Sequence, residues 1–179
     1  MPSPRLPGGP TKDEVMAVSL YKLGLRNTDT VLEVGCGTGK VTVALGLQAR
    51  TVFSIDRRPE AVSAATESVE KTGLRNVRIS CTDALSFLSA DQTYDCSFLG
   101  GTKQLGEIIP ILAGKTRRTI VINAVLVSTL NTAVEAMMRL GIFREAVQVQ
   151  AARSHRIAGS IMFRPVDPVY IIVGSGLSC

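Results

Sequence analysis

The chain has 179 residues, of which 45% are hydrophobic and 20% are charged, and its formal net charge is +5. These values predict one globular domain with its own core and exclude a disordered chain. The sequence lacks the run of about 20 apolar residues that a membrane span needs, and its Pro- and Gly-rich start lacks the apolar core of a signal peptide. We therefore expect a cytoplasmic protein.

The positive net charge indicates an anionic partner, either nucleic acid or a polycarboxylate small molecule. Aromatic residues make up only 4% of the chain and tryptophan is absent. Because bases bind by stacking on aromatic rings, this composition favours the small molecule, and we predict no nucleic-acid partner. The four cysteines form no C-x-x-C pair, and the single histidine, His155, belongs to no metal-binding motif. We expect no disulfide and no metal held by the protein.

Residues 1–10 are rich in proline and glycine and predict an irregular segment, which leaves residues 11–179 for the folded domain. A helix follows, in which Thr11 is the expected N-cap and Glu14 its partner in a capping box. Gly24 can end this helix. Its apolar face is suited to packing on a sheet, and the helix could also lie over a pocket as a lid.

A short apolar strand at residues 31–34 leads into a loop in which every second residue is glycine: Gly35, Gly37 and Gly39. Such a loop lets the backbone approach a ligand, and the helix after it offers free N–H groups. A dinucleotide loop reads G-x-G-x-x-G or G-x-G-x-x-A, whereas Lys40 stands at the last small position. Glu33 would repel a pyrophosphate but suits a cofactor with ammonium and sulfonium charges. S-adenosylmethionine (SAM) is such a cofactor.

The second strand, residues 51–56, ends in Asp56, a carboxylate about 20 residues beyond the glycines, where a ribose diol is held in nucleotide-binding folds. The strand, the glycine loop and this carboxylate fall in register. Together they favour a cofactor site over a tight turn with a surface aspartate. An enzyme that binds NAD remains an alternative.

The remainder of the chain continues the alternation of strands and helices. A strand at residues 77–81 delivers Asp83 and Ala84 to the sheet edge that also carries Gly35 and Asp56. A strand at 94–99 ends in a glycine pair, and the strand at 119–124 is apolar throughout, as a parallel strand covered on both faces should be. Ser128 is expected to cap the next helix.

Three further strands, at residues 147–151, 161–163 and 169–173, have no helical pattern between them. They therefore should pair antiparallel. The sequence predicts an α/β fold with a seven-stranded, mostly parallel sheet, an antiparallel last strand and helices on both faces.

This order of elements, with the loop at residues 33–39, resembles the class I SAM-dependent methyltransferases over nearly the whole chain, and it implies their Rossmann-like domain. Within that class the sequence is most similar to the decarboxylating cobalt-precorrin C15-methyltransferases. The closer likeness rests on short segments whose order and spacing agree: Gly9-Pro10-Thr11, residues 56–61, Gly100-Gly101, residues 123–126 and residues 167–169.

The resemblance implies roles for individual residues. Glu33 would hold the methionine amino group, directly or through water, and the backbone of the glycine loop would pass under the methionyl and ribose parts. Asp56 would bind the ribose hydroxyls, Asp83 the adenine amino group and Ala84 the adenine edge. A cap on the following turn is the alternative role for Asp83. The full set of cofactor candidates is Thr11, Glu33, Gly35, Cys36, Gly37, Thr38, Gly39, Asp56, Arg57, Asp83 and Ala84.

The reaction that the resemblance implies is methyl transfer to C15 of cobalt-precorrin-6B with loss of carbon dioxide from the C12 acetate, in anaerobic cobalamin biosynthesis. S-adenosylhomocysteine (SAH) is the second product, and the family implies a homotetramer. Alignment of the reactants supplies most of the rate in such chemistry, so we expect no Ser/His/Asp arrangement. The candidates for positioning the reactants are Gly100, Gly101 and Arg153, although the glycine pair could simply break a strand.

An anionic tetrapyrrole calls for cationic side chains, arginine above all. Four candidates are predicted at or just beyond the carboxyl ends of strands, where ligands bind in open α/β sheets: Arg57, Lys103, Arg153 and Arg156. Solvated loop charges are the alternative for each. An RNA (tRNA) methyltransferase and a SAM-binding protein without catalytic activity are the competing functions.

Overall fold

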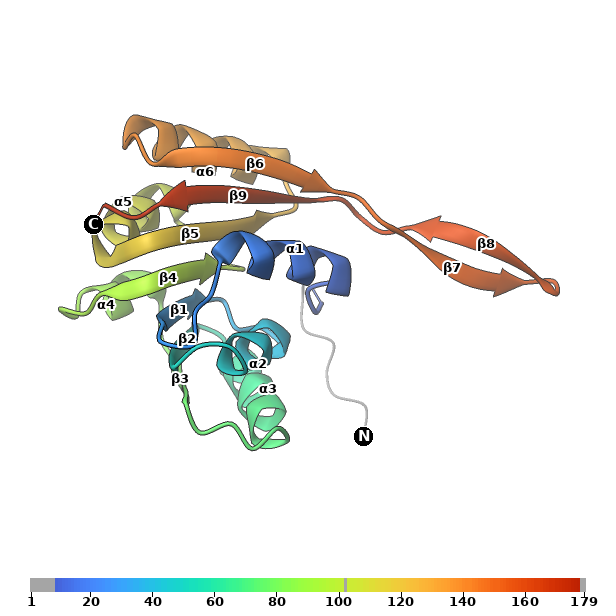
Figure 1. The fold of residues 1–179 in the computed structure, drawn as a ribbon, viewed down its shortest axis with the longest axis horizontal. Helices are drawn as coiled ribbons and strands as arrows, with labels where there is room; N and C mark the ends of the chain where they lie inside the picture. The colour runs from blue at the N-terminus through green and yellow to red at the C-terminus, as the bar shows by residue number, and fades with distance from the viewer. Residues whose placement is uncertain (1–8, 102, 178–179) are drawn as a thin grey trace.

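Buried strands alternate with helices in the computed structural model, which describes residues 9–101 and 103–177 (Figure 1). The helices are α1 (Asp13–Leu23), α2 (Lys40–Gly46), α3 (Pro59–Glu70), α4 (Ala84–Leu88), α5 (Leu105–Lys115) and α6 (Val127–Arg139). The strands are β1 (Thr30–Val34), β2 (Thr51–Asp56), β3 (Val77–Cys81), β4 (Tyr94–Leu99), β5 (Thr116–Ala124), β6 (Phe143–Val149), β7 (Ala152–Ile157), β8 (Ser160–Pro165) and β9 (Val169–Ser175).

Seven of these strands form one sheet in the order β3-β2-β1-β4-β5-β9-β6. The strands β1 to β5 are paired in parallel, whereas β9 runs antiparallel to both of its neighbours, β5 and β6. The predicted mostly parallel sheet with a reversed last strand is therefore confirmed. The reversed strand lies inside the sheet because residues 171–173 are buried apolar residues that need cover on both sides.

Helices cover both faces of the sheet, as predicted. On one face, α1 and α2 contribute Val15, Leu23 and Leu45 to a core shared with β1, β4, β5 and β9. On the other face, α4, α5 and α6 close the second core, to which Leu112 and Met137 belong. The parallel order places the carboxyl ends of β1, β2, β4 and β5 at one edge, and this edge carries the site.

Two predicted helix caps are wrong. The helix α1 begins at Asp13, and within the described residues its N-cap, Lys12, makes no side-chain capping hydrogen bond. Thr11 therefore lies one residue too early for the predicted capping box, and the Glu14 carboxylate instead accepts hydrogen bonds from Arg153. Ser128 lies inside α6 and does not cap it. Residues 1–8 of the predicted irregular segment lie outside the described residues.

The strands β7 and β8 form a separate antiparallel pair that extends beyond the domain (Figure 1). We call this pair, residues 152–165, the arm. All residues of both strands are exposed. The turn consists of Ala158 and Gly159, whose φ values of 46° and 75° are those of a type I′ turn. Among the described residues, none of the helices is long and apolar enough to cross a membrane.

Candidate active site

A cavity of about 910 Å³ opens at the carboxyl edge of the parallel strands. This volume lies within the range of small-molecule sites, and the position is the one at which open α/β sheets bind ligands. Most of the predicted cofactor residues line it. They are Thr11, Glu33, Gly35, Cys36, Gly37, Thr38, Asp56, Arg57, Asp83 and Ala84.

The glycine loop is held against the end of β4 by backbone contacts. The N–H groups of Gly100 and Gly101 both donate to the Val34 carbonyl oxygen, at 2.9 and 3.0 Å. Gly35 has a φ of +90°, and a Cβ atom on it would lie 2.5 Å from the Gly101 nitrogen. Both loops line the cavity, so the crossing backbones form its floor without side chains.

Gly39 has a packing role that the sequence did not predict. A Cβ atom there would lie 2.6 Å from the Ala65 Cα atom in α3, and Gly39 is not among the residues that line the cavity. Its lack of a side chain therefore lets α3 pack close to the start of α2. The Ser68 hydroxyl donates to the Thr38 carbonyl oxygen at 2.8 Å and fixes the same contact.

Glu33 is fully buried in the middle of this edge of the sheet. Its Oε2 atom accepts hydrogen bonds from the hydroxyls of Thr42 and Ser54, both at 2.5 Å. Its Oε1 atom is buried and has no hydrogen-bond partner within the described part of the chain. Burial, together with the negative charge of Asp56, raises the pKa of Glu33 to about 7 in spite of the two hydroxyls. The site therefore holds a buried acceptor that lacks a donor.

Asp56 lies at the end of β2 and is only 6% exposed. Its carboxylate is bound by Arg58, two residues further along the chain. The Arg58 side chain donates from Nε to Oδ1 and from Nη2 to Oδ2, each at 3.0 Å, and the Gly37 N–H donates to Oδ2 at 3.2 Å. Burial opposes ionisation of Asp56, but these hydrogen bonds outweigh it and lower its pKa. The sequence analysis did not predict Arg58 as the partner of Asp56. Its position, a cation two residues after the acid, was the signal that could have indicated it.

Asp83 caps α4, with its Oδ1 atom accepting from the Ser86 N–H at 2.9 Å. This is the alternative role that the sequence left open, and it leaves the side chain on the cavity wall beside Ala84.

Cys36 is buried in the glycine loop. Burial, with the charges of Glu33 and Asp56, raises the pKa of its thiol to about 12. The thiol is therefore protonated and is not a nucleophile at neutral pH.

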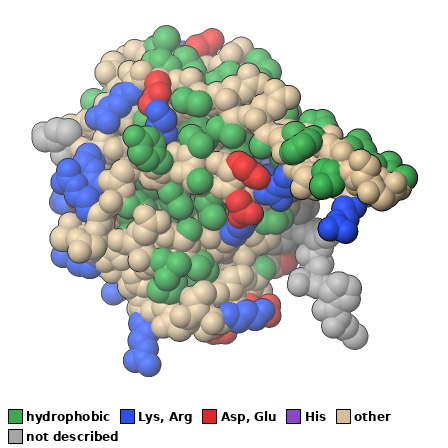
Figure 2. Space-filling view, turned by 45° about the vertical axis from the view of Figure 1, so that its right-hand side comes forward, with side chains coloured by type: hydrophobic (Ala, Val, Ile, Leu, Met, Phe, Trp, Pro, Cys, Tyr) green, Lys and Arg blue, Asp and Glu red, His purple; other side chains and the backbone are tan. Residues whose placement is uncertain are grey.

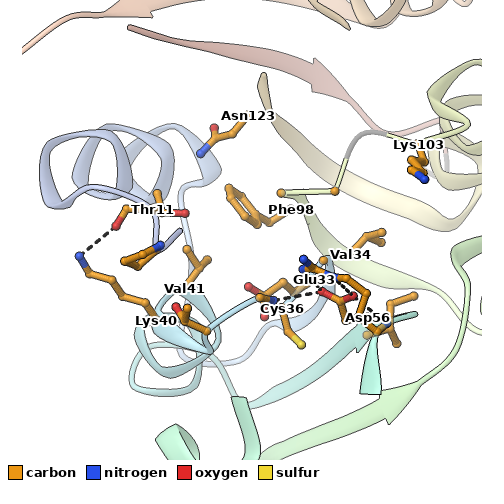
Figure 3. Close-up of a pocket in the computed structure, with 18 of the residues that line it drawn as sticks. Thr11, Glu33, Val34, Cys36, Lys40, Val41, Asp56, Phe98, Lys103 and Asn123 are labelled. Carbon is orange, nitrogen blue, oxygen red and sulfur yellow. Dashed lines mark hydrogen bonds and ion pairs between the residues drawn. The ribbon is translucent and has the colours of Figure 1, made fainter. Parts of the chain in front are cut away.

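The start of α1 covers one side of the cavity, as Figure 3 shows. The Lys40 ammonium donates to the Thr11 carbonyl oxygen at 2.9 Å and forms an ion pair of 2.6 Å with Asp13. Lys40 is the residue that departs from the dinucleotide pattern. Its side chain connects the helix after the glycine loop to the segment that covers the pocket.

The four cationic candidates separate into two groups. Arg57 and Lys103 line the cavity, whereas Arg153 and Arg156 are not among its lining residues and lie on β7. The Arg153 guanidinium donates to both oxygens of Glu14, at 2.9 and 2.7 Å, and this contact lowers the pKa of Glu14 to about 2. In the described ranges, 9–101 and 103–177, groups of three or more metal-ligating side chains are absent.

The strand order with one reversed strand, and the glycine loop between two carboxylates at the carboxyl edge, define the class of Rossmann-like methyltransferases. Residues 7–174 match the family model described as the precorrin methyltransferase domain. The chain belongs to this family, and the family predicted from its sequence is confirmed.

Similar proteins span nearly the whole chain. A protein of Methanosarcina mazei with the name "probable cobalt-precorrin-6B C(15)-methyltransferase (decarboxylating)" is 45% identical over 172 residues, which cover 93% of this chain and 94% of the relative. A crystal structure described as precorrin-8W decarboxylase, from Methanobacterium thermoautotrophicum, is 31% identical with a TM-score of 0.89 and covers 93% of this chain and 91% of its own. A precorrin-6Y C5,15-methyltransferase from Geobacter metallireducens is 29% identical, with a TM-score of 0.89 and coverage of 96% and 94%.

Proposed function

We propose that this protein transfers the methyl group of SAM to C15 of cobalt-precorrin-6B and promotes the loss of carbon dioxide from the C12 acetate. The observation that carries the proposal is a cavity in which two carboxylates flank a glycine-rich loop, one of them with a buried oxygen that is unpaired within the described residues, in a chain of the precorrin methyltransferase family. The names of its relatives support the choice of substrate.

The residues present fit SAM. Its ammonium group would supply the donor that Glu33 Oε1 lacks, and its ribose diol would bind to Asp56 beside Arg58. Asp83 and Ala84 would contact the adenine. When bound, SAM supplies an electrophilic methyl group.

The chain itself contributes alignment and electrostatics. The floor formed by Gly35, Gly100 and Gly101 leaves space for two reactants to approach, because no Cβ atom projects from it. Arg57 and Lys103 place positive charge on the cavity wall, where they would hold carboxylates of the macrocycle. Arg153 and Arg156 would meet the substrate only outside this cavity.

The proposal is tested by mass spectrometry of cobalt-precorrin-6B incubated with SAM. We expect a product that has gained one methyl group and lost one carbon dioxide. In Asp56→Ala the loss of hydrogen bonds to a charged acceptor should weaken cofactor binding by about 10- to 100-fold and reduce the product accordingly at low SAM concentration. Asp91→Ala, which removes an exposed carboxylate, is the matched control and should leave the product unchanged.

Two failures can be distinguished. If the tetrapyrrole returns unchanged although SAH binds, the substrate assignment is wrong and the cofactor site stands. RNA would then be the substrate to test. If Asp56→Ala and Asp91→Ala behave alike, the assignment of the ribose site is wrong.

We also propose that the protein assembles with further copies of itself, as a homotetramer. The arm carries exposed apolar side chains on both strands, among them Ile157, Ile161 and Phe163, and Figure 2 shows hydrophobic surface along it. A two-stranded hairpin is marginally stable alone in water. Contact with another copy would bury this surface and hold the arm in place.

A further inference from the structure

One part of the cavity is not explained by the cofactor. The predicted cofactor residues lie mainly at the ends of β1, β2 and β3. The cavity continues over the ends of β4, β5 and β9, where Phe98, Asn123 and Val169 line it beneath the first turns of α1. Among these three residues, Asn123 is the one whose side chain, an amide, can form hydrogen bonds.

The amide of Asn123 is held in one orientation. The hydroxyl of Ser19, a buried residue of α1, is shared between the Val15 carbonyl oxygen at 2.8 Å and Asn123 Oδ1 at 3.0 Å. This three-centre hydrogen bond divides the one hydroxyl proton between two acceptors. Because Oδ1 is fixed in this way, the NH₂ group is turned away from Ser19, and in Figure 3 it points toward the space between Thr11 and Phe98.

The Nδ2 atom of Asn123 is buried and has no hydrogen-bond partner in the described part of the chain. Buried amide groups in folded proteins are paired in the great majority of cases, so an unpaired donor on a cavity wall needs an explanation. Since the residue lines the cavity, an acceptor on a bound molecule could supply the missing partner.

The distance from Glu33 argues that this acceptor does not belong to the methionine end of SAM. In the register of the sheet, Glu33 pairs with Phe98 and Phe98 with Val121, so these side chains share one face with Asn123. Two strand spacings of about 4.8 Å separate β1 from β5. The Phe98 ring lies between the two polar groups, and this separation favours an acceptor that is not part of the methionine end bound at Glu33.

We propose that Asn123 Nδ2 donates a hydrogen bond to a carboxylate of the tetrapyrrole, and that Ser19 orients the amide for this contact. The inference rests on the proposed function and adds to it a residue that recognises the substrate. A neutral amide at this position can donate a hydrogen bond to an anion, whereas a carboxylate in the same place would repel the anion. The chemistry at residue 123 therefore selects the charge of the group that binds there.

The test is a comparison of Asn123→Ala and Asn123→Asp with the wild type in steady-state turnover of cobalt-precorrin-6B at saturating SAM. We expect KM for the tetrapyrrole to rise about 10- to 100-fold in Asn123→Ala, as for the loss of a hydrogen bond to a charged group. Asn123→Asp should raise it further by repulsion. The Kd of SAH, measured by calorimetry, should stay within about twofold of the wild-type value in both variants.

Two further variants serve as controls. Asn131→Ala removes an exposed amide from α6 and should change neither KM nor the Kd of SAH. Ser19→Ala leaves Asn123 in place but frees its amide to rotate, so KM should rise less than in Asn123→Ala, again without a change in SAH binding. A fall in SAH affinity that parallels the rise in KM would instead indicate a structural role.

Several results would overturn the inference. An unchanged KM in Asn123→Ala, with an active wild type, excludes substrate contact at this amide. Turnover by Asn123→Asp equal to or above that of the wild type means that the ligand offers a donor or a positive charge. If the wild type shows no methyl transfer, both the proposed function and this inference are wrong. The wild-type assay alone distinguishes this failure from the others.

Discussion

Glu33 is the residue in which burial and charge conflict most directly. Its carboxyl is completely enclosed, one oxygen is satisfied by two hydroxyls and the other is not. Burial raises its pKa to about 7 from the ordinary 4.5, so near neutral pH about half of the molecules carry a protonated Glu33. A cationic group placed at Oε1 would favour the ionised form.

We expect the affinity for SAH to depend on pH through this group. The ammonium of the ligand requires ionised Glu33, and below pH 7 a proton must first leave. The affinity should therefore fall about tenfold for each pH unit below 7 and level off above it. Calorimetry at pH 5.5, 6.5, 7.5 and 8.5 measures this. In Glu33→Gln the affinity should be weaker and independent of pH over the same range.

The same shift affects the stability of the ligand-free protein. Because the folded-state pKa lies above that of the unfolded chain, the folded state holds the extra proton between about pH 4.5 and 7, and stability is lost as pH rises through this window. Urea unfolding at pH 5 and 8 should show a larger loss in the wild type than in Glu33→Gln. Equal losses would mean that Glu33 titrates normally.

At the scale of elements, the site depends on two loops that cross. The loop after β1 and the loop after β4 touch at Gly35 and Gly101, and both Gly100 and Gly101 donate to the end of β1. The contact is between backbones, so it tolerates no side chain at Gly35. The cavity floor and the stability of the sheet edge are thus set by the same residues.

Gly35→Ala should destabilise the protein by about 2 kcal/mol or more, because alanine is strained at a φ of +90° and its Cβ atom would meet the Gly101 nitrogen. SAH binding should be lost as the floor is displaced. Gly106→Ala is the matched control: it lies in the first turn of α5 with open space around the new methyl group and should leave the stability unchanged or raise it by less than about 1 kcal/mol. Urea unfolding of both variants measures these changes. A Gly35→Ala protein as stable as the wild type would contradict the close backbone contact between the two loops.

At the scale of the whole molecule, the arm is the feature whose apolar surface is not covered within a single copy. Every residue of β7 and β8 is exposed, and Ile161 and Phe163, which are 65% and 68% exposed, lie two apart on one face of the hairpin. Arg153 connects the base of the arm to α1 through Glu14. The arm is therefore anchored to the domain at one end and bare beyond it.

The double variant Ile161→Asp/Phe163→Asp should dissociate the assembly. Light scattering of the wild type should give about four times the chain mass of 19.1 kDa, and the variant should give a smaller species because two desolvated apolar contacts become charged. Leu47→Asp, at a residue 68% exposed at the end of α2, controls for the loss of surface hydrophobicity. A monomeric wild type would refute the assembly outright.

The parallel half of the fold was predictable because its signals are local. Residues 31–34 and 119–124 are short, mostly apolar runs, interrupted by Glu33 and Asn123, that favour buried central strands, and the glycine loop follows directly from its sequence. The arm was only partly predictable: residues 153–156 are polar, and their turn is built on Ala158 with a positive φ, which alanine does not signal. The partners of Glu14 and Asn123 depend on tertiary contacts, so the sequence predicted neither the Arg153 pair nor the Asn123 Nδ2 atom left unpaired within the described residues.

The position of β9 has a consequence for synthesis. It is the last of the described strands along the chain, yet it lies between β5 and β6, and Ile122 of β5 pairs with Ile172. Until β9 leaves the ribosome, a nascent chain exposes the apolar edge of β5 and has nothing to hold β6 in place. Although β9 lies largely outside the cavity, a chain truncated before Val169 should therefore be captured by chaperones or aggregate, and the sheet should close only after residues 169–175 have been translated.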